Sequence, residues 1–209
     1  MEHEGILVVI SGFAGAGKGT IVKGLIEGYD NYALSVSMTT RQPRPGEKNG
    51  EAYFFVSREE FEKTIEEGGL IEHARYVDNY YGTPKAYVEE KLKAGRDVIL
   101  EIELQGALQV RKLYPEALLL FVTPPSAEIL KKRLTDRGTE TPEVIKKRMN
   151  RAAEEAEMMD KYDYIIVNDK IEESIAHTHA VIQAAHSVPF RMKKLTESLQ
   201  KDLLEMSKQ

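Results

Sequence analysis

The chain has 209 residues, of which 42% are hydrophobic and 30% are charged, and its net charge at pH 7 is −5. Such values are typical of a soluble globular protein and argue against a general nucleic-acid binder, so an anion site has to be a local basic patch. No apolar stretch approaches the ~20 residues that cross a bilayer, the acidic N-terminus is no targeting signal, and Cys is absent. We therefore expect a cytoplasmic protein with neither membrane nor nucleic-acid partners.

The first predicted elements are a strand at residues 6–10, a glycine-rich turn and a helix at 18–28. This order is the pattern of a phosphate-binding loop. The glycines allow successive N–H groups to face one point, and the helix dipole points there too. Lys18 would reach the β- and γ-phosphates of a nucleoside triphosphate. The predicted loop residues are Gly12, Phe13, Ala14, Gly15, Ala16, Gly17, Lys18, Gly19 and Thr20.

One position departs from the strict loop pattern. Gly19 stands where Ser or Thr would follow the lysine, and Thr20 comes one residue later. We therefore expect Mg²⁺ to be held mainly by phosphates and water, which this ion tolerates. Thr20, and Glu101 through water, are the candidate protein contacts. The alternative is that the glycines form only a turn, which the preceding strand and the position of Lys18 disfavour.

Strands and helices alternate along most of the remaining chain. This alternation predicts an α/β fold, a P-loop NTPase-like parallel five-stranded sheet flanked by helices. Ligands of such sheets bind at the carboxyl ends of the strands. The further strands are expected at 32–37, 97–102, 118–122 and 164–167, and the further helices at 85–94, 106–113, 127–133 and 142–159.

Two segments interrupt the alternation. Residues 38–85 are rich in Gly, Pro, Arg and Tyr, and contain a short strand at 53–56 followed by Ser57 as a helix N-cap, so we expect a small α+β insertion. The basic segment 131–151 carries Arg137-Gly138 and is typical of a closing lid. The interpretation is a single domain with core 1–37, 86–125 and 160–186, insertion 38–85, lid 126–159 and a C-terminal tail 187–209.

Two helices are predicted near the C-terminus, one after Asp169 and one after Pro189 in the tail. The second is amphipathic, with Leu195, Leu199 and Leu203 spaced four residues apart. Such spacing favours docking on the protein's own surface, and self-association is the alternative. Whether the chain is a monomer or a homodimer stays open at this point.

Several motifs occur in order along the chain. They are SVSMTTRQPRPGEKNGEAYFFV from Ser35, then LIEHA, NYYGTP, ILEIELQG, KKRLTDRGTET and VND. Together with the loop, they resemble the guanylate kinases, which transfer phosphate from ATP to GMP, over about residues 7–169. The resemblance implies ATP and GMP as substrates, with dGMP as a further acceptor, and Mg²⁺ as the cofactor.

A cluster of donors is predicted for the GMP phosphate. Arg41 and Arg44 flank a proline that stiffens the backbone, and two guanidinium groups three residues apart suit one phosphate monoester. The hydroxyl groups of Tyr53 and Tyr81 can add two donors. The resemblance assigns all four residues to the GMP phosphate. The alternative is a surface loop with solvated arginines.

Guanine presents two adjacent donors, N1–H and N2–H₂, on its Watson–Crick edge, and a carboxylate can accept both. By resemblance, Glu72 is that carboxylate, and Ser37 and Thr83 are the hydroxyls that complete recognition. The alternative for Glu72 is a solvated surface glutamate. Adenine would meet the carboxylate with an unprotonated N1, so the pair would discriminate between the purines.

Glu101 and Glu103 alternate with apolar residues, which predicts that both carboxylates point to one face of a strand. We expect them near Lys18, the water shell of Mg²⁺ and the guanosine. The guanylate kinases usually have Asp at one or both places. A structural charge pair with Lys18 or Arg41 is the alternative.

The resemblance also assigns residues to the donor nucleotide. Arg133, Arg137 and Arg148 match arginines that close over the transferring phosphate, and Asn168 and Asp169 match residues that receive adenine. The predicted catalytic cations are Lys18, Arg44, Arg137 and Arg148. Two other functions stay open: a catalytically inactive protein-interaction module, and a kinase with another acceptor such as dAMP, UMP or a ribose phosphate.

Overall fold

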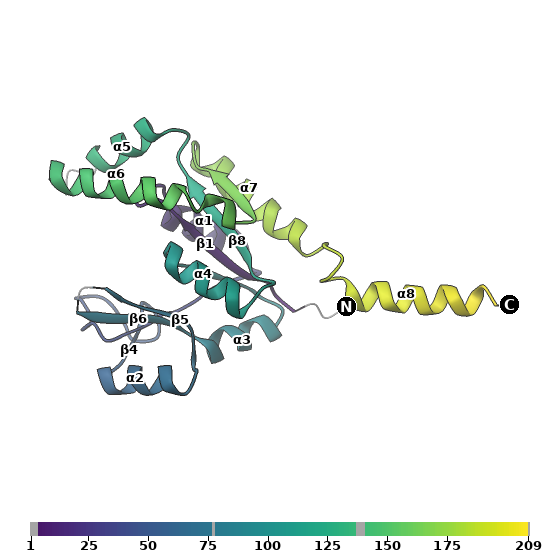
Figure 1. Ribbon diagram of the computed structural model, residues 1–209. Coiled ribbons are helices and arrows are strands. Elements are labelled where there is room, and N and C mark those ends of the chain that lie inside the picture. The colour runs from purple at the N-terminus through teal and green to yellow at the C-terminus, as the bar shows by residue number, and fades with distance from the viewer. Residues whose placement is uncertain (1–3, 77, 137–140, 209) are drawn as a thin grey trace.

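The computed structural model describes residues 4–76, 78–136 and 141–208. Its centre is a five-stranded parallel sheet in the order β2–β7–β1–β8–β9 (Figure 1). The strands are β1 (Leu7–Gly12), β2 (Tyr32–Leu34), β7 (Asp97–Glu101), β8 (Leu118–Thr123) and β9 (Tyr164–Val167). The predicted P-loop-like α/β fold with its five-stranded parallel sheet is confirmed.

Helices cover the sheet and bury its central strands. On one face α1 (Lys18–Gly28) packs against α7 (Ile171–Ala185), while α4 (Leu104–Leu113) lies against β1 and α3 (Lys85–Lys93) against β7. Val9 of β1 and Leu120 of β8 are completely buried. Both strands are continuous apolar runs, as expected where a parallel sheet is covered on both faces.

A second, four-stranded sheet interrupts the main fold. It has the order β4–β3–β6–β5, and α2 (Arg58–Glu66) lies beside it. Phe61 of α2 is fully buried and stacks on the ring of Tyr80, with ring centroids 5.3 Å apart. The α+β character predicted for this segment is confirmed. The strands are β3 (Met38–Thr39), β4 (Phe54–Phe55), β5 (Leu70–Tyr76) and β6 (Asn79–Pro84).

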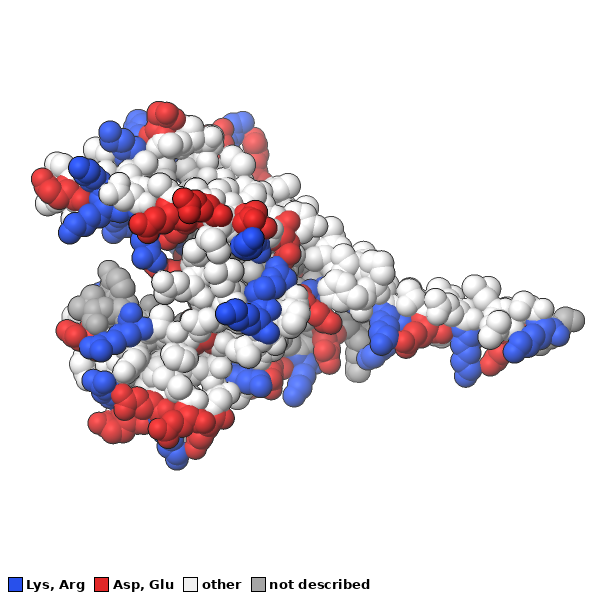
Figure 2. Space-filling view, viewed as in Figure 1, with Lys and Arg blue, Asp and Glu red and all other residues white. Residues whose placement is uncertain are grey.

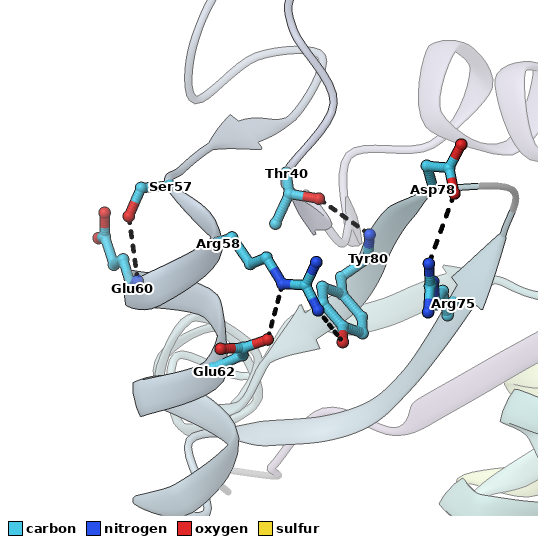
Figure 3. A network of polar contacts seen from close by, with 8 residues as sticks. All are labelled: Thr40, Ser57, Arg58, Glu60, Glu62, Arg75, Asp78 and Tyr80. Atoms are coloured by element: carbon cyan, nitrogen blue, oxygen red, sulfur yellow. Dashed lines mark hydrogen bonds and ion pairs between the residues drawn. The ribbon is translucent and has the colours of Figure 1, made fainter.

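Polar contacts hold α2 against this sheet (Figure 3). The hydroxyl oxygen of Ser57 accepts the backbone N–H of Glu60 at 3.1 Å, which is the predicted N-cap. The Arg58 guanidinium donates to the hydroxyl of Tyr80 at 3.3 Å. The backbone N–H of Tyr80 in turn donates to the hydroxyl of Thr40 at 2.9 Å. The helix start, β6 and the chain after β3 thus form one connected unit.

The segment predicted as a lid contains two helices. They are α5 (Ala127–Asp136) and α6 (Pro142–Ala156), and a short 3₁₀ turn, Met159–Lys161, follows. Thr141 caps α6, because its hydroxyl accepts the backbone N–H of Val144 at 3.4 Å. The expected hinge at Arg137 lies outside the described residues.

Two predicted strand ends are wrong. The strand expected over residues 32–37 ends at Leu34, because β2 is an edge strand and the chain leaves it for the second sheet, where the carbonyl of Ser37 accepts the N–H of Phe54 at 2.8 Å. The strand expected over residues 97–102 ends at Glu101. Glu103 therefore is not on the strand with Glu101 but is the N-cap residue of α4.

The expectation for the tail is also wrong. Helix α8 (Lys193–Met206) does not dock on the protein's own surface but projects away from the body of the molecule (Figure 1). Leu199 and Leu203 are 50% and 64% exposed. Among the described residues, none of the helices is both long and apolar enough to cross a membrane.

The N-cap of α2 gives a test of this local structure. Ser57→Ala removes the oxygen that satisfies the Glu60 N–H, so the free energy of unfolding should fall by about 1 kcal/mol. Urea denaturation followed by circular dichroism measures the change. Ser57→Asp keeps an acceptor at the same place and should retain the stability of the parent, and an equal loss in both variants would contradict the cap.

Candidate functional site

The glycine-rich loop joins β1 to α1 at the carboxyl edge of the main sheet. Gly12 has φ 141°, and a Cβ there would lie 2.0 Å from the carbonyl oxygen of Val122. Any side chain would therefore push the loop away from β8. The Lys18 ammonium donates to the carbonyl oxygens of Gly12 and Phe13 at 2.7 and 3.2 Å. The structure thus places the lysine directly over the turn.

Two side chains from other elements hold the rear of the loop. The amide of Asn168 donates to the carbonyl of Ala16 at 2.7 Å, and the Arg133 guanidinium donates to the same oxygen at 3.4 Å. Arg133 also donates to the carbonyl of Asn168 at 2.9 Å. A Cβ on Gly17 would lie 2.3 Å from the Asn168 amide nitrogen. Asn168 is buried and faces the loop, whereas Asp169 beside it is exposed.

Glu101 lies beside the start of α1. Its carboxylate oxygens are 3.5 and 3.6 Å from the point where a Cβ of Gly19 would stand, so the glycine leaves room for the carboxylate. Removal from water raises the pKa of Glu101, and the nearby positive charge of Lys18 lowers it. Of the pair predicted to share one face, this is the carboxylate that lies near Lys18.

The oxygen donors near the loop fit a hard divalent ion only in part. The Glu101 carboxylate and the hydroxyl of Thr20, exposed on the first turn of α1, are donors that Mg²⁺ accepts. Within residues 4–76, 78–136 and 141–208, however, no three His, Cys, Asp or Glu side chains are grouped as a metal site. An ion here would need further ligands from phosphates and water.

Glu103 belongs to a different contact. The Arg151 guanidinium on α6 pairs with the Glu103 carboxylate at 3.1 Å and with that of Glu155 at 3.1 Å. Burial raises the pKa of Glu155, and the neighbouring Arg151 lowers it. These contacts join the lid helix to the start of α4. The sequence analysis missed Arg151 and Glu155, although their spacing of four residues on a helix predicts an ion pair.

Arg41, Tyr53 and Tyr81 come together beside the second sheet, as predicted for a phosphate site. The Arg41 guanidinium carbon is 5.3 Å from the centroid of the Tyr53 ring, and the rings of Tyr53 and Tyr81 are 6.0 Å apart. The Tyr81 hydroxyl helps to raise the pKa of Arg41, after the larger effect of Glu47. Arg44 lies on the same loop and is exposed.

Glu47 bridges both arginines and was missed in the sequence analysis. Its carboxylate accepts the Arg41 guanidinium at 2.9 Å and the backbone N–H of Arg44 at 2.8 Å. The hydrogen bond from Arg41 lowers the pKa of Glu47. The signal was Arg44-Pro45-Gly46-Glu47, a turn sequence in which Gly46 takes φ 88° and the Glu47 N–H donates to the Arg44 carbonyl at 3.0 Å.

Glu72 and Thr83 form a buried pair on the neighbouring strands β5 and β6. The hydroxyl of Thr83 donates to one carboxylate oxygen of Glu72 at 2.7 Å, and both residues are buried. Burial raises the pKa of Glu72, and hydrogen bonds from Thr83 lower it. A Cβ on Gly106 would lie 3.0 Å from the other oxygen, so α4 approaches closely. Ser37 is half-buried where the chain enters the second sheet.

The lid and the second sheet face each other across a hollow. Figure 2 shows this hollow between α5–α6 and the β5–β6 side of the molecule, with Lys and Arg side chains on both rims among Asp and Glu side chains. Arg148 is on α6 and half-buried, and Arg137 lies outside the described residues. Cationic groups on opposing elements suit a ligand with several negative charges.

Comparison with protein families identifies these features. The family model for guanylate kinase matches residues 4–185. The chain belongs to the guanylate kinase family. The match spans the loop, the second sheet and the lid, and ends at the last residue of α7.

Similar guanylate kinases occur in several bacteria. Guanylate kinase from Halalkalibacterium halodurans is 54% identical over 187 residues, which cover 89% of this chain and 92% of the relative. Guanylate kinase from Oceanobacillus iheyensis is 46% identical over 202 residues, 97% of this chain and 98% of the relative. The crystal structure of guanylate kinase from Anaplasma phagocytophilum matches with a TM-score of 0.73 and 34% identity, covering 94% of this chain and 96% of that one.

The buried carboxylate gives a pH-dependent test. The pKa of Glu72 is raised above its ordinary 4.5, so the folded state binds this proton more tightly than the unfolded state, and stability falls as pH rises through the folded pKa. Glu72→Gln removes the buried charge and should unfold at higher urea concentration than the parent at pH 7. The advantage should vanish below pH 4.5, where the parent is protonated in both states.

The control for this test is Glu66→Gln on the exposed part of α2, which should change stability little at either pH. A Glu72→Gln variant less stable than the parent at pH 7 would contradict the assigned cost of burying the carboxylate.

Proposed function

We propose that the hollow between the lid and the second sheet brings ATP and GMP together, with Glu72 as the residue that identifies guanine. As a guanylate kinase, this chain catalyses ATP-dependent phosphorylation of GMP. The proposal concerns which side chains carry out each part. The observation that supports it most is the buried Glu72 carboxylate, which accepts the hydroxyl of Thr83 on β6, the strand that also carries Tyr81 of the group formed with Arg41 and Tyr53.

Glu72 suits guanine because its two oxygens have different surroundings. Thr83 donates to this buried carboxylate through its hydroxyl and its backbone, and an ionised carboxylate has about four acceptor positions, so it can accept further donors. Guanine N1–H and N2–H₂ would supply them, while adenine would leave the acceptor opposite an unprotonated N1. An unpaired buried acceptor costs about 1–3 kcal/mol, which favours guanine. Ser37 and Thr83 complete this pocket, and dGMP, with the same base and phosphate, is a further acceptor.

The GMP phosphate is proposed to bind Arg41, Arg44, Tyr53 and Tyr81. The Glu47 carboxylate accepts the Arg41 guanidinium and the Arg44 backbone N–H. A phosphate dianion offers more charge and more acceptor oxygens than a carboxylate, so it competes well for the guanidinium. Glu47 would then keep the Arg44 turn in place while the phosphate binds the arginine side chains.

The transfer step is proposed to be direct and in line. A phosphate oxygen of GMP forms a bond to the γ-phosphorus of ATP, the bond to the β,γ-bridging oxygen breaks, and ADP and GDP result. The GMP phosphate is already largely anionic at pH 7, so positioning and charge neutralisation replace a strong base. The cations proposed to act are Lys18, Arg44, Arg148 and, from the resemblance, Arg137.

Other residues would position the donor nucleotide. The backbone N–H groups of residues 12–20 bind its phosphates, and Asn168 and Arg133 hold the loop through Ala16. We assign Asp169, exposed beside Asn168, to the adenine. Closure of the lid and the insertion 38–85 over the core would exclude water from the transferring group.

Guanylate kinases use ATP, generally with a divalent metal, and we propose Mg²⁺ in this chain. Thr20 and Glu101 would hold the ion through water, at the place where Gly19 leaves room. The ion neutralises charge on the β- and γ-phosphates when bound. We place the reaction in the cytoplasm, where ATP and GMP are found.

An inactive interaction module is the second function considered from the sequence. Nothing in the comparisons favours it, and the chain keeps Lys18 over the loop. Glu72 with Thr83 likewise disfavours a kinase for another acceptor.

Lys18→Met tests the loop. The variant keeps the length of the side chain but loses its charge, so kcat for ADP formation should fall at least about 100-fold, the usual size of a lost electrostatic contact in a transition state. A coupled assay that depends on added GMP measures the rate. The melting temperature should stay close to that of the parent, and a fully active variant would contradict the role of the loop.

Glu72→Gln tests base selection. Replacing one acceptor oxygen by an amide should lower kcat/KM for GMP by about 10- to 100-fold while the rate with AMP changes little, because only guanine offers two donors there. The ratio of kcat/KM for the two nucleotides is the measurement, with Glu66→Gln as the matched control. An unchanged ratio would show that another residue reads the base.

A further inference from the structure

Helix α8 carries an apolar face that the rest of the described chain leaves uncovered. At 3.6 residues per turn, Leu195, Leu199, Leu203 and Met206 fall within an arc of about 80°. The last three are 50%, 64% and 68% exposed. In Figure 2 the charged side chains of α8 run along one side of the helix and leave the other side white. A stripe of this kind is expected to be buried in the working protein.

A cavity lies at the N-terminal end of the same helix. It has a volume of about 940 Å³ and includes Leu7, Leu113, Phe190 and Leu195 in its lining. Leu113 and Phe190 are 61% and 53% exposed. Leu195 belongs both to this cavity and to the apolar face of α8, so the apolar face continues into the cavity, whose lining also carries charged residues such as Glu116 and Arg191. The cavity meets the start of β1, the end of the sheet opposite the glycine loop.

The charges on α8 are distributed unequally along its length. The first half of the helix carries Lys193, Lys194 and Glu197, a net charge of +1, and the second half carries Lys201, Asp202 and Glu205, a net charge of −1. The helix dipole adds partial positive charge at the start and negative charge at the end. A second α8 packed antiparallel therefore sets acidic residues against basic ones, whereas parallel packing would set like ends together.

We propose that α8 is a dimerisation element, whose occupant is the α8 of a second copy of this chain packed antiparallel. With the two-fold axis near Leu199, Leu203 and Met206 of the partner subunit lie beside the start of α8, at the mouth of the cavity. Lys194 then lies on the same flank as Asp202 of the partner subunit, which borders the apolar face. The arrangement is isologous, so one set of contacts covers both apolar faces and both cavities.

A membrane surface is a poorer occupant for this helix. Interfacial helices usually carry a strongly basic polar face. Here the polar face mixes Lys193, Lys194 and Lys201 with Glu197 and Glu205, and Lys193 pairs with Glu197 at 3.6 Å. This mixture complements a second α8 better than it complements anionic lipid.

Sedimentation equilibrium of the full chain tests the proposal. The parent should have twice the 23.6 kDa mass of one chain at micromolar concentration. Leu199→Asp and Leu203→Asp should each give the mass of a single chain, since each puts a charge in the centre of the apolar face. Lys201→Asp introduces the same side chain on the opposite face and should remain dimeric. All three variants should keep the GMP-dependent turnover of the parent per chain, which also shows that they are folded.

Charge reversal tests the antiparallel orientation. Lys194→Glu and Asp202→Lys should each raise the dimer dissociation constant on the order of 5-fold, and the double variant should return toward the parent value.

Three results would overturn the proposal. The first is a parent protein that is monomeric at all concentrations, including one that instead floats with vesicles of mixed anionic lipid. The second is a dimer that Leu199→Asp leaves intact. The third is a double charge-reversal variant whose dimer dissociation constant is no lower than those of the single variants. The turnover assay is independent of these outcomes, because α8 lies away from the loop and the second sheet.

Discussion

The close contact between Gly12 and the carbonyl of Val122 is the constraint on which the site depends, because a Cβ would lie only 2.0 Å from that oxygen. It allows the chain to turn directly out of β1, so that Lys18 returns over the carbonyls of the turn. Asn168 and Arg133 then hold the loop from behind through Ala16. The loop conformation is thus set by three strand ends of the buried sheet, which preorganises its N–H groups for phosphate.

Three carboxylates near the site differ in their surroundings. Glu72 is buried against Thr83, which raises its pKa and prepares an acceptor that gains from new donors. Glu47 is held by Arg41, which lowers its pKa and keeps it ionised. Glu101 lies between these cases, partly removed from water but close to Lys18. Burial thus raises the pKa of Glu72 and of Glu101, whereas the hydrogen bond from Arg41 lowers that of Glu47, so the same chemical group is suited to different tasks by its surroundings.

The sequence predicted the elements that depend on local patterns: the apolar strands, the loop, and the Ser57 cap. It misplaced the end of β2 and the position of Glu103, because those ends are set by hydrogen bonds to distant strands and by the start of a helix. The group around Arg41 and Glu72 was predicted by motif resemblance. The turn sequence around Glu47 was a local signal that was overlooked, whereas the contact of Arg151 with Glu103 joins elements 48 residues apart, which no local pattern predicts. An amphipathic pattern predicted that α8 has an apolar face but could not show what covers it.

The central claim is that Glu72 reads guanine while the loop and Arg41 hold two sets of phosphates across one hollow. The most direct measurement is a crystal structure with GMP and a non-hydrolysable ATP analogue. The account predicts guanine N1 and N2 bonded to the Glu72 carboxylate, the GMP phosphate on Arg41, Tyr53 and Tyr81, and the ATP analogue's phosphates on the loop under Lys18. Guanine bound away from Glu72, with its Watson–Crick edge on other residues, would contradict the account.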